Sequence, residues 1–430
     1  MYNYKMHLNP EEVEIFEGSQ GEVLAKIMKT IVMYGDTFNA SRLVPVTGEY
    51  GHLVTSFGLS MMKPVYKLMD EIIDAGLVSK QSFTVDPRPL DFENVPSNFL
   101  QKTVFKIMYG KQQDYEAQLK KVGLLNDNSF TCTCYMDQVG NAPKMGDVLS
   151  WAESSAVVYA NSVLGARCNR NSGIIEMFGS ILGKVPYFGL LTDEGRMANY
   201  VVEIKTSSLP EAQILGSAIG MKVMDNVPYI KGLGQYFGNK LNKSAKDYLK
   251  DMGAATASNG AVGLFHIEDL TPEASELGEK IIVENPIVYV VDDEELNRVK
   301  SSYPIMWKNK DDKPKLCFIG CPHLSLEQMI LWTNKIKEAL ANEKINKVKI
   351  PTVMTSSVSV IEEFEKLPEA KELSNMGIDT SYICPLMYMN NPLCRNMPVI
   401  TNSNKLRTYT TSRYCTDSEI LEAVAKGGLN

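Results

Sequence analysis

Residues 316–340, LCFIGCPHLSLEQMILWTNKIKEAL, contain the clearest structural signal in the chain. An apolar run typical of a buried strand is followed by a Gly-Cys-Pro-His turn and a long helical segment. Ser325 and Gln328 stand at the spacing of a capping box, which places the start of that helix. The same order of strand, polar loop and helix recurs in VVEIK before SLPEAQILGSAIG, in IVYVV before DDEELNRVK and in KIPTVM before VSVIEEFEKL. This alternation predicts an α/β fold with parallel sheets covered by helices.

Length and composition bound the class of protein. At 430 residues the chain exceeds what one hydrophobic core usually holds, so we expect one catalytic unit, 1–430, with tentative lobes 1–285 and 286–430 and a cleft between them. A formal net charge of −7 without a dense basic block argues against nucleic acid as a partner. The acidic N-terminus does not resemble a signal peptide, and no apolar run approaches the ~20 residues that span a bilayer. We therefore predict a cytoplasmic protein without a membrane partner.

Three loops are expected to point at one site. In parallel sheets the ligand crevice lies beyond the carboxyl ends of the strands. The loops GCPH (320–323), MTSSVS (354–359) and ITNSNK (400–405) all follow predicted strands. We therefore expect their side chains to line the same pocket.

Eight cysteines are spread along the chain, and the sequence has no C-x-x-C pair. This spacing excludes ordinary zinc ribbons and bacterial ferredoxin patterns. Cys321 stands at a strand-to-helix corner, where backbone donors and a helix N-terminus favour the metal-binding thiolate. Cys132 and Cys134 share one face of the run TCTCY, and Cys384 precedes Cys394 by ten residues. Three or four of these thiols could meet at one cluster, or each could be a separate buried thiol.

The run ESSAVVYANSVLGARCNRNSG, residues 153–173, is the most informative one for a ligand site. Two serines open a helix of small residues, and Arg167 and Arg170 follow its expected end together with two asparagines. These hydroxyl, guanidinium and amide donors suit a carboxylate ligand. The alternative is a small-residue helix packed in the core, with its arginines solvated. The sequence patterns of serine hydrolases, P-loop proteins and dinucleotide-binding proteins are absent.

Taken in order, these motifs resemble the catalytic, large-subunit portion of the aconitase X family. The similar runs extend over nearly the whole chain and are GHLVTSFG, TCTCY with GNAPKMGD, ESSAVVYANSVLGARCNR, VPYIKGLG, SNGAVGLFH with TPEA, GCPHLSLEQ, and CPLMYMNNPLC with ITNSNKLRTYT. The resemblance implies aconitase-superfamily catalytic lobes that lack the swivelling domain. It also implies a dehydratase, a type of hydro-lyase, with an iron-sulfur cluster held by three cysteines.

The resemblance assigns roles to particular residues. The implied cluster ligands are Cys132, Cys321 and Cys384, and the alternates are Cys134, which stands where the family usually has proline, and Cys394. The candidate catalytic residues are Ser154, Ser155 and His52, and the candidate substrate-binding residues are Arg167, Asn169, Asn161, Ser162, Thr401, Ser403 and Lys405. The family's catalytic base is a serine of the swivelling domain, so we expect it on a separate small subunit.

The expected substrate is cis-3-hydroxy-L-proline, which would lose water to give 1-pyrroline-2-carboxylate. Its carboxylate and hydroxyl lie on one face of the ring, so one Lewis-acidic iron can hold both. Mevalonate 5-phosphate is the alternative substrate, but it needs a second anion site, and basic residues near the expected site are few. A cluster-free binding or scaffold subunit is the third hypothesis, slightly favoured by the 22 methionines.

Overall fold

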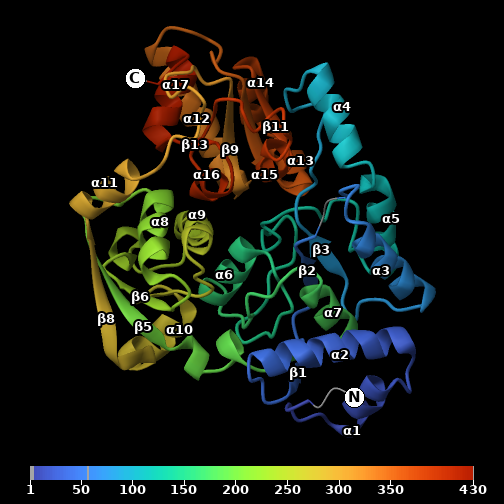
Figure 1. Cartoon of the computed structure of the whole chain (residues 1–430). Helices are drawn as coiled ribbons and strands as arrows, with labels where there is room; N and C mark the ends of the chain where they lie inside the picture. Colours follow the sequence, from blue (N-terminus) through green and yellow to red (C-terminus); the bar gives the residue numbers. More distant parts are fainter. Residues whose placement is uncertain (1–3, 56–57, 430) are drawn as a thin grey trace.

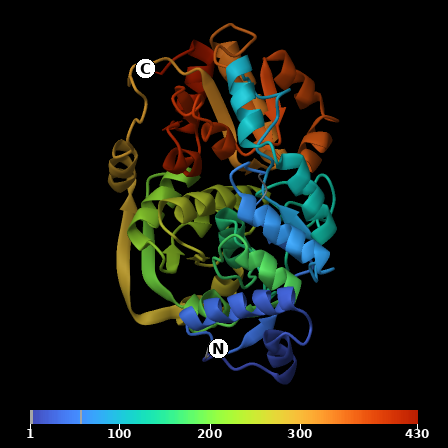
Figure 2. The same ribbon diagram turned by 45° about the vertical axis from the view of Figure 1, so that its right-hand side comes forward.

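The computed structural model describes residues 4–55 and 58–429, which form three lobes in chain order (Figure 1). The two ends of the chain lie at opposite ends of the molecule, in this view and in the rotated view of Figure 2. The second and third lobes are each built on a parallel sheet covered by helices, so the predicted fold class is confirmed. No helix in the described part of the chain is long and apolar enough to span a membrane.

The first lobe is mainly helical, with two short two-stranded sheets, β1–β4 and β2–β3, among its helices. Residues 99–122 form two helices, because Tyr109 ends the first of them. The elements are α1 (Pro10–Glu17), α2 (Glu22–Thr37), β1 (Leu43–Pro45), β2 (Gly51–Leu53), α3 (Lys63–Asp74), β3 (Phe83–Val85), α4 (Phe99–Met108), α5 (Gln112–Val122), α6 (Ser154–Ser162), α7 (Ile175–Leu182) and β4 (Lys184–Pro186), followed by the short turns η1 (Gly189–Leu191) and η2 (Glu194–Arg196).

The second lobe has the strand order β7-β6-β5-β8. Its elements are β5 (Ala198–Lys205), α8 (Ala212–Val223), β6 (Pro228–Lys231), η3 (Gly234–Phe237), α9 (Lys243–Asn259), β7 (His266–Ile267), α10 (Pro272–Leu277), η4 (Gly278–Ile281), β8 (Ile282–Asp292) and α11 (Asp293–Ser301). The expected division between lobes 1–285 and 286–430 falls inside β8. This strand pairs with β5 as far as Lys205 opposite Asp292, so the chain enters the third lobe only after α11.

The third lobe has the strand order β11-β10-β9-β12-β13, and all of its strand pairs are parallel. Every residue of β9 is buried, which explains its unbroken apolar sequence. The predicted capping box is present at the start of the next helix, α12. The elements are β9 (Leu316–Leu324), α12 (Leu326–Asn342), β10 (Thr352–Ser356), α13 (Val358–Phe364), α14 (Pro368–Asn375), β11 (Ile378–Ser381), α15 (Pro385–Met389), β12 (Val399–Thr401), α16 (Asn404–Tyr409), β13 (Arg413–Tyr414) and α17 (Asp417–Lys426).

The run TCTCY, whose alternation suggested a strand, does not form one. Phe130 makes an isolated bridge with Val85, and the chain then continues in turns. The hydroxyl of Thr131 accepts a hydrogen bond from the backbone N–H of Thr133, at 3.1 Å. Such local side-chain bonds compete with a strand ladder, which accounts for the difference.

Candidate active site

A pocket lies between the first and third lobes, where α15 and α16 face α6 and β3 (Figure 1). Its lining residues are Asp86, Pro87, Cys132, Glu153, Gly320, Cys321, His323, Cys384, Pro385, Leu386 and Lys405. The loops GCPH and ITNSNK contribute to it as expected, whereas residues 354–359 are not among the lining residues. The pocket therefore joins segments from both halves of the chain.

The three cysteines that the sequence singles out as ligands, Cys132, Cys321 and Cys384, all line this pocket. Cys132 is 9% exposed, Cys321 is 8% exposed and Cys384 is half-buried, whereas the other five cysteines are at most 1% exposed. Burial raises the pKa of all three thiols, to about 12 for Cys384. The thiols are therefore protonated without a metal, and binding a metal would release protons.

The two alternate cysteines lie outside the pocket. Cys134 is fully buried beside His52. Cys394 is fully buried beside Tyr388. Neither thiol is placed to replace one of the three pocket cysteines in this arrangement.

Backbone geometry fixes the segments that carry Cys321 and Cys384. Gly320 has a φ of 107°, and a Cβ atom there would lie 2.5 Å from the carbonyl oxygen of Thr355, so this position requires glycine. The Cys321–Pro322 peptide bond is cis. Cys384 is the N-cap of α15, and its backbone N–H donates to the carbonyl of Arg88 at 2.9 Å. This last bond ties the third lobe to the first.

A buried ion pair joins Lys405 of α16 to Glu153, the N-cap residue of α6. The Lys405 ammonium also donates to Oγ of Ser155 at 3.2 Å, and that hydroxyl donates to Glu153 at 2.6 Å. Burial acts to lower the pKa of Lys405, but the charge of Glu153 raises it well above its ordinary value. Burial likewise acts to raise the pKa of Glu153, and Lys405 lowers it instead. Both groups are therefore charged at neutral pH.

Asp86 and His52 form a second polar pair at the wall of the pocket. The Oδ1 atom of Asp86 lies 3.4 Å from Nε2 of His52, and both atoms are buried without a hydrogen bond in the described part of the chain. The Nδ1 atom of His52 lies 2.9 Å from Oγ1 of Thr84. Burial raises the pKa of Asp86 to about 6, even though His52 acts to lower it. Asp86 lines the pocket, whereas His52 lies behind it.

Several residues expected to bind substrate have structural partners elsewhere. Arg167 is paired with Asp193 at 2.5 Å and bonds the carbonyl of Leu191 at 3.0 Å. Asn169 lines a different cavity, near Phe188. Three more candidates are held by main-chain groups, and their bonds are Asn161 to the carbonyls of Cys168 and Gly263, Ser162 to the N–H of Phe265, and Thr401 to the N–H of Ser403.

The three other serines expected at the site, Ser154, Ser155 and Ser403, have different contacts. Ser403 caps α16 by accepting from the N–H of Leu406 at 3.1 Å, and so fixes the helix that carries Lys405. Ser155 bonds Glu153 and Lys405, whereas Ser154 is the first residue of α6 and is not among the lining residues. Of the residues expected to act on the substrate, Lys405 therefore reaches the pocket itself.

Sequence reasoning did not select Glu153 or Asp86 as site residues, and it included His323 only as a member of the loop GCPH, although all three line the pocket. Glu153 begins the ESS motif, so its place at a helix N-terminus was visible. Asp86 follows the short strand β3, and a polar residue at the carboxyl end of a strand is a general sign of a ligand site. His323 follows Cys321 by two residues, but its contacts depend on tertiary structure.

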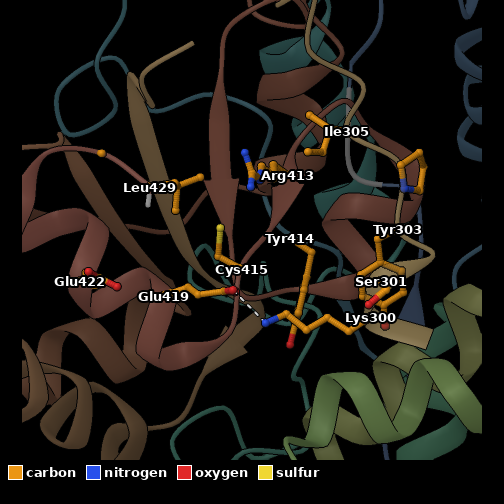
Figure 3. A pocket seen from close by; sticks show the side chains of 12 residues that line it. Lys300, Ser301, Tyr303, Ile305, Arg413, Tyr414, Cys415, Glu419, Glu422 and Leu429 are labelled. Carbon is orange, nitrogen blue, oxygen red and sulfur yellow. Dashed lines mark hydrogen bonds and ion pairs between the residues drawn. The ribbon is translucent and has the colours of Figure 1, made fainter. Parts of the chain in front are cut away.

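A larger cavity of about 340 Å³ lies near the C-terminus (Figure 3). Most of its charged groups have partners: Lys300 bonds Glu419 at 2.8 Å and Lys426 bonds Glu422 at 2.8 Å, and the guanidinium of Arg413 lies over the ring of Trp307 at 5.7 Å. Cys415 is the one cysteine among the described residues that line it. The smaller pocket between the lobes has the more reactive set of side chains.

The donor set of that pocket fits an iron-sulfur cluster. In the described part of the chain, no group of three or more His, Cys, Asp or Glu side chains could hold a single metal ion. Cluster ligands bind different iron atoms, so they can lie farther apart than the ligands of one ion. Three thiols face one pocket, and its lining, as far as the described residues form it, includes no fourth cysteine; this matches a cluster held by three residues.

Comparisons with known proteins agree with this architecture. Residues 5–194 match the aconitase X first domain and residues 198–301 match the aconitase X second domain. The chain is 31% identical over 354 residues to the phosphomevalonate dehydratase large subunit of Methanocaldococcus jannaschii. The aligned region covers 79% of this chain and 80% of that protein. It is 23% identical over 415 residues to the cis-3-hydroxy-L-proline dehydratase of Hypocrea jecorina, over 94% of this chain and 65% of that protein.

A solved structure gives the same result for the fold. The holo-form of Thermococcus kodakaraensis aconitase X superposes with a TM-score of 0.79 at 27% identity, covering 97% of this chain and all of that one. Since the two domain matches cover more than half of its length, the chain belongs to the aconitase X family. The expected enzyme class, a hydro-lyase of the aconitase X type, is confirmed.

Proposed function

We propose that this chain is the large subunit of a two-chain dehydratase that removes water from cis-3-hydroxy-L-proline to give 1-pyrroline-2-carboxylate. The observation that carries the proposal is the convergence, in one pocket, of three partly accessible cysteines, the Lys405–Glu153 pair and Asp86. Cys132, Cys321 and Cys384 would hold an iron-sulfur cluster. When bound, the cluster would supply a Lewis-acidic iron for the substrate carboxylate and the departing hydroxyl.

Lys405 and Asp86 offer complementary contacts to a hydroxyproline. An ammonium has three donors, and Glu153 and Ser155 occupy two of those of Lys405. The third donor is available to a substrate oxygen. Asp86 lines the pocket with a side chain that is 18% exposed, so Oδ2, the oxygen that does not face His52, can accept from the protonated ring nitrogen. The pocket thus suits a ligand that carries both a carboxylate and an ammonium.

The balance of charge favours the amino acid over a phosphate ester. Glu153 is paired with the ammonium of Lys405, and Asp86 with His52, whose pKa burial acts to lower but Cys134 and Asp86 raise well above its ordinary value, so each carboxyl group at the pocket already has a basic partner. His323 adds no positive charge at neutral pH, because burial lowers its pKa to about 4. The lining residues that the structure describes therefore leave no unpaired basic side chain for a phosphate, which needs a second anion site, whereas a hydroxyproline does not need one.

Elimination also needs a base on the substrate face away from the iron. Ser155, which contacts two of the lining residues, is bonded to both Glu153 and Lys405. We therefore place the base on a separate small subunit that covers the pocket. The Methanocaldococcus jannaschii relative, which is named a large subunit, supports a two-chain enzyme.

Mevalonate 5-phosphate is the second candidate substrate, and two observations favour it. The 31% identical relative is named a phosphomevalonate dehydratase large subunit. Arg170 makes no hydrogen bond or ion pair among the described residues, and it lines a cavity of about 350 Å³. Glu153 and Asp225 lie within electrostatic reach of its guanidinium. A phosphate could bind there only against these two carboxylates.

The test is an assay of the chain combined with the small subunit from the same organism, under anaerobic conditions. We expect water loss from cis-3-hydroxy-L-proline, and little activity from the chain alone. Selective turnover of mevalonate 5-phosphate would replace the first candidate with the second. Absence of iron from active protein would reject the cluster-dependent reaction for both substrates.

A further inference from the structure

All four hydrogen-bonding atoms of His323 are occupied, and they lead to three separate segments of the chain. The imidazole Nδ1 lies 3.0 Å from Oγ1 of Thr131, the residue before Cys132. The imidazole Nε2 lies 3.1 Å from the carbonyl oxygen of Ile383, the residue before Cys384. His323 itself follows Cys321 by two residues. One side chain therefore connects the segments that carry the three pocket cysteines.

The main chain of His323 is held as firmly as its ring. Its N–H points at Sγ of Cys132, with the nitrogen 3.5 Å from the sulfur. Its carbonyl accepts from the buried ammonium of Lys250 at 2.8 Å. That ammonium also donates to Oε1 of Gln328 at 2.5 Å and pairs with Asp251 at 3.2 Å, so it anchors the residue to α9.

The bonding pattern fixes the tautomer of the ring. A carbonyl oxygen only accepts, so Nε2 carries the hydrogen and donates it to Ile383. The Nδ1 atom is left to accept from the hydroxyl of Thr131, which lies 3.0 Å away. The hydroxyl of Thr131 in turn accepts from the N–H of Thr133. Each link thus has one donor and one acceptor, and no atom of the ring remains for a substrate.

We propose that His323 is a positioning residue that sets the spacing of the three thiols, with its Nδ1 side fixing the Cys132 segment and its Nε2 side fixing the Cys384 segment. This role rests on the proposed function in that the three thiols are the cluster ligands. The spacing itself is a property of the full chain without a cluster, so it can be measured whatever the substrate is.

The two sides of the ring can be removed separately. In His323→Asn the side-chain amide reaches the position of Nδ1 and keeps the bond to Thr131, but it is too short to reach Ile383. In His323→Gln the amide reaches the position of Nε2 and keeps the bond to Ile383, but it loses the bond to Thr131. Thr131→Val replaces the hydroxyl with a methyl group, which removes the bond to His323 together with the bonds to Thr133, and so tests the Cys132 side without changing the histidine.

The probe is dibromobimane, which becomes fluorescent when both of its arms have reacted with neighbouring thiols. The full chain is stripped of iron anaerobically, treated with the probe, digested and mapped by mass spectrometry. The five other cysteines, being at most 1% exposed, give little background. His266→Asn is the matched control, because His266 is equally buried and bonds the carbonyl of Arg196 at 2.9 Å in the second lobe.

We expect His323→Asn to lower the yield of Cys321–Cys384 cross-links by about fivefold while leaving Cys132–Cys321 cross-links near the wild-type yield, as the loss of one net hydrogen bond implies. His323→Gln and Thr131→Val should show the opposite pattern, and His266→Asn should match the wild type. Circular dichroism identifies any variant that fails to fold, and Thr131→Val then carries the test. Wild-type cross-link yields in all of these variants would overturn the proposal. A chain that lacks dehydratase activity but shows the expected cross-links would disprove the function and leave the positioning role standing.

Discussion

The carboxylate of Glu153 and the ammonium of Lys405 form an ion pair whose side chains are 4% and 8% exposed, between the first and third lobes. The pair links the N-terminus of α6 to α16 across 252 residues of sequence. A charge this deeply buried is stable only while its partner is present. The relationship therefore affects both the stability of the fold and the charge of the pocket.

Glu153→Gln should destabilise the protein by about 3–5 kcal/mol, because it leaves the Lys405 ammonium buried without a counter-charge. Urea denaturation at pH 7 measures this loss. Asp114→Asn is the control, since it breaks the exposed pair of Asp114 with Lys111 and should change stability by less than about 1 kcal/mol. Equal losses of stability in the two variants would show that the buried pair contributes no more to stability than the exposed one.

Lys405→Met should lower kcat/KM by about 10²–10³-fold, the usual loss when one preorganised charged donor is removed from an active site. Lys405→Met also leaves the carboxylate of Glu153 buried without a partner and should therefore lower the stability of the protein. Adding Glu153→Leu removes this carboxylate and should restore part of the stability. Iron content should stay at the wild-type level in the single variant, because Lys405 is not a metal ligand. A variant that loses iron in parallel with activity would assign Lys405 to cluster binding instead.

Arg167 and Arg170 should differ when each is replaced by Gln. Arg170 has no ion-pair partner among the described residues and lines the cavity that the second candidate substrate would use, so its loss should raise KM for mevalonate 5-phosphate by about tenfold and leave KM for cis-3-hydroxy-L-proline nearly unchanged. Arg167 is engaged by Asp193 and the carbonyl of Leu191, so its loss should lower the melting temperature and leave KM nearly unchanged. Steady-state kinetics and thermal unfolding of both variants distinguish the roles, and the reverse pattern would restore Arg167 as the substrate clamp.

Glu211 should make stability depend on pH. Burial, aided by Asp417, raises the pKa of its carboxyl to about 7, whereas an unfolded glutamate titrates near ~4.3. Between these pH values the folded state holds a proton that the unfolded state has lost, so the free energy of unfolding falls as pH rises. Glu211→Gln should therefore be more stable than the wild type at pH 8, by up to ~3 kcal/mol, with a smaller difference at pH 5.

Denaturation of Glu211→Gln at both pH values measures this effect. The amide can keep both existing bonds, from the N–H of Asp417 at 3.1 Å and with the hydroxyl of Tyr414 at 3.0 Å. The exposed substitution Glu365→Gln provides the control and should show no such trend. A stability difference that does not change with pH would contradict the raised pKa.

Local sequence signals predicted those parts of the fold that local chemistry determines. The strand and capped helix of residues 316–340 are β9 and α12, because an unbroken apolar run and the Ser325–Gln328 pair act within a few residues. TCTCY was misinterpreted because the hydroxyl of Thr131 bonds its own backbone and His323, and neither bond is visible in an alternating pattern. The expected division between the lobes, after residue 285, falls inside β8, because the pairing of this strand with β5 is a tertiary contact that the local sequence does not show.

The site was predictable to a similar extent. The motifs selected Cys132, Cys321, Cys384 and Lys405, all of which line the pocket. Arg167 was also selected, but it is not among the lining residues, because its guanidinium is paired with Asp193. Asp193 lies 26 residues further along the chain, so the local sequence around Arg167 does not reveal this pair. Sequence could not show which of two neighbouring arginines is already paired. That difference is decided by a tertiary contact.

The central claim, that Cys132, Cys321 and Cys384 hold an iron-sulfur cluster, is tested most directly by iron and acid-labile sulfide analysis of anaerobically purified protein. We predict iron and sulfide in the wild type, their loss in Cys132→Ser, Cys321→Ser and Cys384→Ser, and their retention in Cys134→Ser and Cys394→Ser. Wild-type iron content in any of the first three variants, or its loss in either of the last two, would contradict this assignment.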